Sequence, residues 1–321
     1  MLILAIISTV NVEARNVEIY VIPGGDSIGL QLRPGVYITG KYDVKTVNGE
    51  VTPWKSSDLE VGDKIVAIND IEVSRIADIQ KILSSLKEEG ELTLKIKRKT
   101  QILMTTCRAV RDKSGKMTLG LYVKDEVLGI GTVTYIEPET KKFGALGHAM
   151  ISDEVSGSNI GTISTSSVRG IRKSLPGIPG EKHATLNNNP VGTILKNNEI
   201  GVFGIVHDLG DFSGSQAIKV ALPNEVHVGK AELLTVLGSN KIESFSVEIV
   251  EVKPQSSKDI KGIKFKVTDK ELLEKTGGII QGMSGSPVIQ DNKLVGAVSH
   301  VVIDSPDFGY CVYAMWMIDS F

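Results

Sequence analysis

Short runs in which apolar and polar residues alternate recur along the chain, as they do in half-buried β-strands. Residues 92–98 alternate strictly, with a period of two. Residues 76–86 instead space their apolar side chains as one face of a helix does, and residues 270–275 are expected to form a second, short helix. Glycine-rich turns separate these runs. The pattern predicts a mainly β fold with some α-helix.

Composition narrows the class of protein. The 321 residues are enough for two domains, and a hydrophobic content of 41% is that of a folded chain. The net charge of -2 gives no basic footprint, so we expect no nucleic-acid partner. Cys107 and Cys311 could form one disulfide or remain two buried thiols, and we prefer thiols because neither lies in a metal-ligand or C-x-x-C pattern. The histidine spacing indicates no metal site, and we expect no cofactor.

The first ten residues are apolar and uncharged, but a bilayer span takes about 20 residues. They resemble the apolar core of a signal peptide, and Val12-Glu13-Ala14 could serve as a cleavage site. The alternative is a buried β-strand. We expect residues 1–16 to be a signal or anchor segment and the rest of the chain to act outside the cytoplasm.

Residues 17–105 resemble a PDZ domain. The resemblance rests on V-G-D-K-I-V-A-I-N at residues 61–69 and on the helix and strand that follow. It implies a carboxylate-binding loop, whose N–H groups bind the end of a peptide that adds as a strand to the sheet edge. That loop would consist of Ser27, Ile28, Gly29 and Leu30. The alternative is a PDZ-shaped scaffold with a closed or occupied groove.

A glycine-rich turn near the C-terminus suggests a nucleophilic serine. Ser284 stands between Gly282 and Gly285, and an apolar run lies on each side of the turn. An exposed hydroxyl beside main-chain donors is what acyl transfer needs, and the N–H groups of Gly282 and Ser284 would form the oxyanion hole. The alternative interpretation is a Gly/Ser turn that connects two strands and has no catalytic role.

Two more residues complete a candidate catalytic set. His148 follows a strand in a small, glycine-flanked setting and could be a general base or a core histidine. Asp269 ends a strand before the second helix, where it could orient the imidazole or cap the helix. The order His148, Asp269, Ser284 is that of chymotrypsin-like serine proteases. Residues 106–321 are therefore predicted to form a chymotrypsin-like β-barrel serine peptidase domain. Ser286 remains an alternative nucleophile, and Asp153 an alternative third member.

Longer runs resemble one family, the stage IV sporulation protein B peptidases of endospore-forming bacteria. They are F-G-A-L-G-H-A-M-I-S-D at residues 143–153 and T-D-K-E-L-L-E-K-T-G-G-I-I-Q-G-M-S-G-S-P at residues 268–287. The resemblance covers about residues 19–316. It implies that His148, Asp269 and Ser284 are the catalytic residues. Met283 replaces the acidic residue before the nucleophile in chymotrypsin-type enzymes, so we do not expect activation by a new N-terminus.

The resemblance also implies a biological role. Such a peptidase is made in the forespore, crosses its membrane and acts in the space facing the mother cell. There it cleaves a component of a membrane-embedded complex that restrains processing of a late sigma factor. Members of the family also cleave themselves, under control of the PDZ domain. Self-association through the PDZ domain is among the partner interactions we consider.

Two rival functions stay open. One is a catalytically inactive PDZ adaptor, which predicts that Ser284 is shielded and His148 lies out of its reach. The other is a surface-binding β domain, which would need exposed aromatic platforms, and only Trp54 and Trp316 are present. If the protein is an enzyme, occupancy of the PDZ domain is expected to align the catalytic residues. The isolated segment 106–321 would then cleave more slowly than the full chain.

Overall fold

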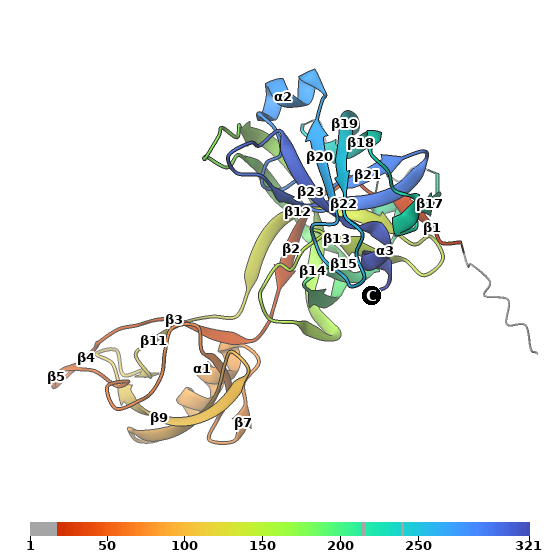
Figure 1. Ribbon diagram of the computed structural model, residues 1–321. Helices are drawn as coiled ribbons and strands as arrows, with labels where there is room; N and C mark the ends of the chain where they lie inside the picture. Colours follow the sequence, from red (N-terminus) through yellow and green to blue (C-terminus); the bar gives the residue numbers. More distant parts are fainter. Residues whose placement is uncertain (1–17, 213–215, 239–240) are drawn as a thin grey trace, which may run out of the picture.

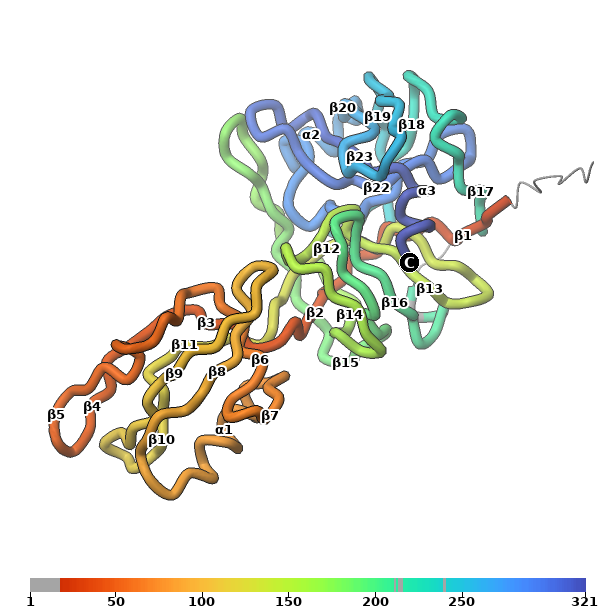
Figure 2. Tube along the Cα trace, turned by 60° about the horizontal axis from the view of Figure 1, so that its bottom comes forward, coloured from red at the N-terminus to blue at the C-terminus, as the bar shows by residue number. Residues whose placement is uncertain are grey.

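The computed structural model describes residues 18–212, 216–238 and 241–321. The chain forms two bodies, which lie side by side in both views (Figures 1 and 2). The smaller body spans residues 36–124. The larger body contains the described residues from 127 to the C-terminus, together with two strands that precede the smaller body in the sequence.

The smaller body has one main sheet in the order β10-β9-β8-β6-β3-β11, with β7 paired to β6, and a separate β4–β5 hairpin. Its elements are β3 (Val36–Lys41), β4 (Val44–Thr46), β5 (Gly49–Val51), β6 (Lys64–Ile68), β7 (Ile71–Glu72), α1 (Ile76–Ser85), β8 (Gly90–Arg98), β9 (Gln101–Arg111), β10 (Met117–Thr118) and β11 (Leu121–Lys124). The predicted helix and alternating strand are α1 and β8. Leu92, Leu94 and Ile96 of β8 point into the same core as Ile79 and Ile82 of α1.

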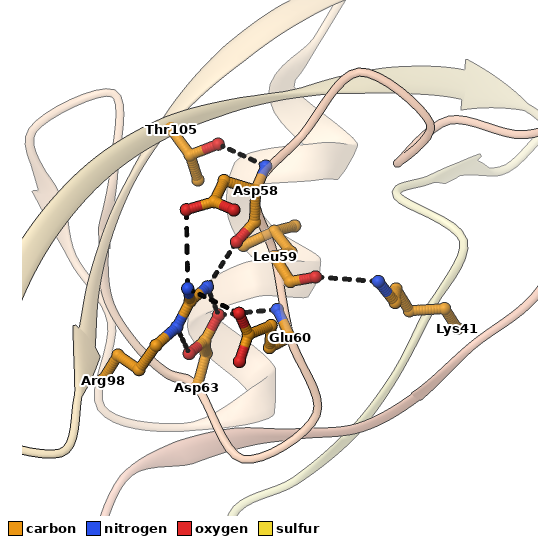
Figure 3. Close-up of polar contacts among 7 residues, drawn as sticks. All are labelled: Lys41, Asp58, Leu59, Glu60, Asp63, Arg98 and Thr105. Atoms are coloured by element: carbon orange, nitrogen blue, oxygen red, sulfur yellow. Dashed lines mark hydrogen bonds and ion pairs between the residues drawn. The ribbon is translucent and has the colours of Figure 1, made fainter.

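One arginine organises the loop that precedes β6 (Figure 3). Arg98 Nε donates to Asp63 Oδ1 (2.7 Å) and Nη2 to Asp63 Oδ2 (2.9 Å), while Nη1 reaches Glu60 Oε1 (2.8 Å). Arg98 also donates to the carbonyl of Asp58. Asp63 is buried, and its Oδ2 accepts the N–H of Glu60 as well (2.8 Å). The V-G-D motif thus places a buried carboxylate that fixes this loop to the end of β8.

The larger body contains two closed β-barrels within the described residues. In the first, β13-β16-β15-β14-β2-β12 is closed by the pairing of β12 with β13. In the second, β22-β21-β18-β19-β20-β23 is closed by the pairing of β22 with β23, and β1 and β17 connect the two. Each barrel has its own apolar core. This architecture confirms the prediction of a chymotrypsin-like β-barrel fold.

The strands of the first barrel and its connection are β1 (Tyr20–Pro23), β2 (Ser27–Leu32), β12 (Val127–Ile136), β13 (Lys142–Ala145), β14 (Val155–Arg172), β15 (Glu181–Asn198) and β16 (Gly201–Val206). The remaining elements are η1 (Leu209–Asp211), β17 (Ile218–Val220), η2 (Pro223–Glu225), β18 (Gly229–Val236), β19 (Ile242–Val252), β20 (Ile263–Val267), α2 (Lys270–Thr276), β21 (Pro287–Gln290), β22 (Lys293–Val301), β23 (Phe308–Tyr313) and α3 (Ala314–Ile318). Helix α3 packs into a third cluster with residues of both barrels, including Val21, Phe203 and Leu294.

The strand β2 corrects the prediction for the carboxylate-binding loop. Ser27, Ile28, Gly29 and Leu30 are buried in β2, which pairs with β12 on one side and β14 on the other. Because both edges of β2 are already paired, its N–H groups cannot form an open loop for a terminal carboxylate. Strand β11 instead lies antiparallel to β3 at the edge of the smaller body. Residues 20–32, predicted to open the first domain, therefore contribute strands to the first barrel.

The two cysteines are free and buried in separate cores, Cys107 in the smaller body and Cys311 in the second barrel. Burial raises the pKa of both thiols, that of Cys107 to about 12, so neither is a reactive thiolate near neutral pH. No helix among the described residues has the length and apolar character needed to cross a bilayer. The predicted signal or anchor segment, residues 1–16, lies outside the described residues.

Candidate active site

His148 lies on a sharp turn directly after β13. Leu146 and Gly147 both have positive φ (70° and 67°), so the chain turns sharply just before the histidine. His148 Nδ1 donates to the carbonyl of Ala149 (2.8 Å). That bond places the ring proton on Nδ1 and leaves Nε2 with a free lone pair. Burial lowers the pKa of His148 below 6.5, although the bond to Ala149 acts in the opposite direction.

Ser284 lies on the turn between α2 and β21. Gly282 and Gly285 both have φ of 92°, a region that favours glycine. A Cβ at Gly285 would lie 2.1 Å from Thr132 O and 2.4 Å from Leu146 N, so the turn fits tightly against β12 and the His148 turn. Ser284 is partly exposed, whereas Met283, Gly285 and Ser286 are buried. Ser284, the nucleophile predicted from the sequence, is thus more accessible than Ser286.

The main-chain donors of this turn divide into two groups. The N–H groups of Met283, Gly285 and Ser286 donate to Ile280 O (3.1 Å), Val298 O (2.7 Å) and Met283 O (2.9 Å). Within the described part of the chain, the N–H groups of Gly282 and Ser284 donate to no protein acceptor. These two are the donors predicted for the oxyanion hole. Such paired, unused donors beside a hydroxyl are what a tetrahedral intermediate requires.

Two threonines of β12 hold the carbonyl groups of the Ser284 turn. Thr132 Oγ1 donates to Gly282 O (2.9 Å), and Thr134 Oγ1 donates to Gly285 O (2.7 Å). Thr132 N also donates to Ser284 O (2.9 Å). These threonines belong to an ordinary β pattern, so nothing in the sequence distinguishes them from other barrel residues.

The two turns meet at β22. Gly285 N donates to Val298 O, and a Cβ at Gly147 would lie 3.0 Å from the same oxygen. Two residues further along β22, the ring centroid of His300 is 5.8 Å from that of His148. The buried His300 Nδ1 has no partner among the described residues. Burial, followed by the neighbouring His148, lowers the pKa of His300, so both rings favour the neutral form near neutral pH.

Asp269 lies at the N-terminus of α2. Its Oδ1 accepts from Leu272 N (3.0 Å), and its Oδ2 accepts from Ser246 N (3.3 Å). It is therefore the N-cap of α2, the non-catalytic role considered for it. His148 Nδ1 meanwhile has Ala149 O as its acceptor. The structure thus brings the Ser284 and His148 turns together, while Asp269 has separate partners, and the complete triad stays a prediction.

Asp153, the alternative third member, contacts the smaller body instead. Tyr37 of β3 donates its hydroxyl proton to Asp153 Oδ2 (2.6 Å). The segment between His148 and Asp153 is held from the other side by Asn197, which accepts from Met150 N (2.8 Å) and donates to the carbonyls of Ile151 and Asp153. The segment that follows the histidine therefore links the two bodies.

A pocket of about 390 Å³ opens beside the Ser284 turn. It lies between β12, the start of β15 and the turn, and its lining includes Gly129, Glu181, Leu186, Gln281 and Gly282. Gly282, one of the two residues of the predicted oxyanion hole, lines this pocket. Among the described residues, no group of three or more His, Cys, Asp or Glu side chains is arranged to hold a metal ion.

Comparison with known proteins assigns the family. The model of the SpoIVB peptidase S55 family matches residues 115–318, and the PDZ domain model matches residues 27–107. The active form of the Rv3671c protease from M. tuberculosis is 17% identical over 60% of this chain and 72% of that chain, with a TM-score of 0.36. The inactive form is 17% identical over 59% and 81%, with a TM-score of 0.35. No curated protein matches this chain.

The family matches confirm the predicted order of a PDZ domain followed by a peptidase domain. The PDZ match identifies the smaller body as the PDZ domain. This match begins at residue 27, so it also includes β2, which belongs to the first barrel. The peptidase match covers well over half of the chain and includes the turns of His148 and Ser284. The chain belongs to the SpoIVB peptidase S55 family and is a serine peptidase that carries a PDZ domain.

Proposed function

We propose that the protein is a serine endopeptidase in which Ser284 is the nucleophile and His148 the general base. Ser284 Oγ attacks the peptide carbonyl, His148 Nε2 accepts its proton, and the same proton later passes to the leaving amine. The N–H groups of Gly282 and Ser284 hold the oxyanion. The observation that carries the proposal is the partly exposed Ser284 hydroxyl beside two main-chain donors without protein acceptors.

Two further facts support this assignment. The bond from His148 Nδ1 to Ala149 O selects the tautomer whose Nε2 can accept a proton. Ser286, the rival nucleophile, is fully buried, and its Oγ donates to Thr235 Oγ1 (3.1 Å). A buried hydroxyl already engaged with a neighbour cannot reach a peptide carbonyl.

The third member of the triad requires a rearrangement. The resemblance to the family assigns this role to Asp269, which here caps α2. We propose that the present arrangement is latent: the oxyanion donors are in place, and Asp269 engages His148 only when the Ala149 bond is broken. The PDZ domain contacts the segment after His148 through Tyr37 and Asp153, which gives its occupancy a route to the site. Binding energy at the PDZ domain would then favour the aligned state.

We further propose the role that the family resemblance implies. The peptidase is exported across the forespore membrane, where it cleaves a membrane-complex regulator of late sigma-factor processing and also cleaves itself. Its partners are then a protein substrate and the membrane-embedded complex, with self-association through the PDZ domain as a further interaction. Support for this role comes from the residues shared with the family, among them His148, Asp269 and Ser284.

The rival function is an inactive PDZ adaptor, and one observation favours it: His148 and Asp269 have separate partners in this structure. A surface-binding domain has less support. Trp54 and Trp316 are partly buried and pack against the apolar cores, and their indole N–H groups donate to Tyr42 O (3.0 Å) and Gln255 Oε1 (2.6 Å), so neither ring is a fully exposed aromatic platform.

Labelling with a fluorophosphonate tests the proposal. The full-length wild type is compared with Ser284→Ala, Ser286→Ala and His148→Ala, and the modified residue is identified by mass spectrometry. We expect the adduct on Ser284, and we expect its formation to require His148. An adduct on Ser286 would move the nucleophile, and the absence of any adduct, even with a peptide bound to the PDZ domain, would favour the adaptor.

Asp269→Asn separates capping from catalysis, because asparagine caps a helix about as well as aspartate. Asparagine can keep the bond from Leu272 N but loses the weaker bond from Ser246 N (3.3 Å), so we expect a small loss of stability. If Asp269 orients His148, the variant remains folded but labels Ser284 far more slowly. Labelling at the wild-type rate would leave Asp269 as a cap alone.

A further inference from the structure

A buried lysine lies beneath the turn that carries Ser284. Lys182 is near the start of β15, and only 4% of its surface is exposed. Its backbone N–H donates to Gln281 O (3.0 Å), immediately before Gly282. Lysine is almost never fully buried without a charged partner, so this position calls for a functional explanation.

The lysine side chain runs under the oxyanion turn. A Cβ at Gly282 would lie 3.1–3.3 Å from Cβ, Cγ and Cδ of Lys182, which shows that the stem packs directly against this glycine. Nζ donates to Thr235 Oγ1 (2.8 Å), and Thr235 also accepts from Ser286 Oγ (3.1 Å). Both ends of the 282–286 turn therefore rest on a cluster that contains the lysine.

Among the residues that the structure describes, no carboxylate forms an ion pair with this lysine. The groups around Nζ are the hydroxyl of Thr235 on β18 and, beyond it, that of Ser286, and neither is charged. The adjacent carboxylate on β15, Glu181, interacts with Arg172 (3.4 Å) and His183 (3.7 Å), which are both exposed. Burial lowers the pKa of Lys182 to about 7, and no carboxylate counteracts this effect.

We propose that Lys182 is a positioning residue of the peptidase site, which supports the 282–286 turn and, while it is protonated, places a positive charge beneath the oxyanion hole. The inference rests on the proposed function, in which Ser284 is the nucleophile. When Ser284 Oγ bonds to the carbonyl carbon, the carbonyl π electrons move to the oxygen, and the resulting oxyanion lies at the N–H groups of Gly282 and Ser284. A cation in a low-dielectric interior stabilises this new charge more than it would in water.

The inference predicts an unusual pH profile. His148 must be neutral, so reactivity rises as pH increases through its lowered pKa, below 6.5. Lys182 must be protonated, so reactivity falls again as pH increases through about 7. A lysine that only filled space would give no alkaline loss at this pH. The wild type should therefore react fastest in a narrow interval near neutral pH.

The test measures the rate of fluorophosphonate labelling of Ser284 between pH 5 and 9 in the full-length protein. The variants are Lys182→Met, which keeps an unbranched stem one atom shorter than lysine but removes the charge, and Lys173→Met as a control on the same hairpin, where the lysine is exposed. We expect Lys182→Met to react about tenfold more slowly at pH 6.5 and to lose the alkaline decrease. Lys173→Met should match the wild type at every pH.

The possible outcomes separate a role of the Lys182 charge from a failure of the proposed function. If Lys182→Met labels Ser284 at the wild-type rate with the same pH profile, the inference is overturned while the proposed function stands. If the variant does not fold, as urea unfolding would show, the wild-type profile alone decides, because reactivity that stays constant from pH 7 to 9 overturns the role of the lysine charge. If the wild type is not labelled on Ser284 at any pH, the proposed function fails, and this inference fails with it.

Discussion

Replacing the buried carboxylate of the PDZ domain should destabilise that domain far more than replacing an exposed one with the same arginine partner. Asp63→Asn is the perturbation. Asp63 accepts three hydrogen bonds, one from Glu60 N and two from Arg98, and its side chain is only 1% exposed. Asparagine retains a single acceptor oxygen, so its NH₂ group must face at least one N–H donor of Arg98 or Glu60.

The expected cost follows from the bonds lost. A hydrogen bond between a charged donor and acceptor contributes about 1.5–3 kcal/mol, and a donor left facing another donor adds to the loss. We expect Asp63→Asn to lower the free energy of unfolding of the PDZ domain by about 2–3 kcal/mol. With a urea m-value of about 1–1.5 kcal/mol/M for a domain of this size, the midpoint should fall by about 2 M.

The matched control is Asp58→Asn. Asp58 also contacts Arg98, but at 3.4 Å and with 77% of its side chain exposed. Exposed ion pairs of this kind contribute less than about 1 kcal/mol. Unfolding is followed by the fluorescence of Trp54 in a Trp316→Phe background, because these are the two tryptophans and only Trp54 lies in the PDZ domain. Equal midpoints for the two variants would refute the reasoning.

The difference in unfolding free energy between the wild type and Asp63→Asn depends on pH. Burial acts to raise the pKa of Asp63, but the hydrogen bonds from Arg98 and from Glu60 N outweigh it and lower the pKa. The stabilisation by ionised Asp63 is therefore complete above its ordinary pKa of about 4 and is lost as pH falls through the lower folded-state value. The difference in unfolding free energy between the two proteins should therefore decrease only below about pH 4.

Two further predictions concern His148 and the segment that follows it. Tyr37→Phe removes the bond to Asp153 that links the PDZ domain to residues 149–154, so amide hydrogen exchange in this segment should become about fivefold faster, and unchanged exchange would show that the link has no effect on the segment. Because burial lowers the pKa of His148 in the arrangement with the Ala149 bond, the acid limb of Ser284 labelling without a PDZ ligand should lie below pH 6.5, and a limb centred above that value would show that a carboxylate already pairs with the ring.

Local patterns predicted elements that depend on near neighbours. The spacing of Ile79, Ile82 and Leu83 predicts α1, and the strict alternation of residues 92–98 predicts β8, because both patterns are set by which face of one element is buried. The turn at Ser284 could be recognised for a similar reason. Only glycine fits at position 285, where a Cβ would lie 2.1 Å from a backbone oxygen.

Features that depend on distant partners could not be predicted in this way. An apolar strand such as β2 does not indicate which sheet it joins, and its loop-like SIGL sequence suggested the PDZ domain rather than the first barrel. The long β14–β15 hairpin is rich in polar residues and glycine, so its 18-residue strands gave only fragments of a pattern. Lys182 gave no signal, because a lysine in a polar stretch is ordinarily exposed.

The position of β2 changes how latency must be tested. A segment that starts at residue 106 lacks β1 and β2, so it cannot close the first barrel, and its inactivity would say nothing about the PDZ domain. The structure offers a better deletion. Leu32 at the end of β2 lies opposite Val127 at the start of β12, and the two strands are antiparallel neighbours. Such strands can be joined by a short hairpin turn in place of the PDZ domain. If the chain without the PDZ domain labels Ser284 as slowly as the unliganded full chain, removal of the PDZ domain does not activate the site. Faster labelling would show that the PDZ domain restrains the site through contacts such as Tyr37–Asp153.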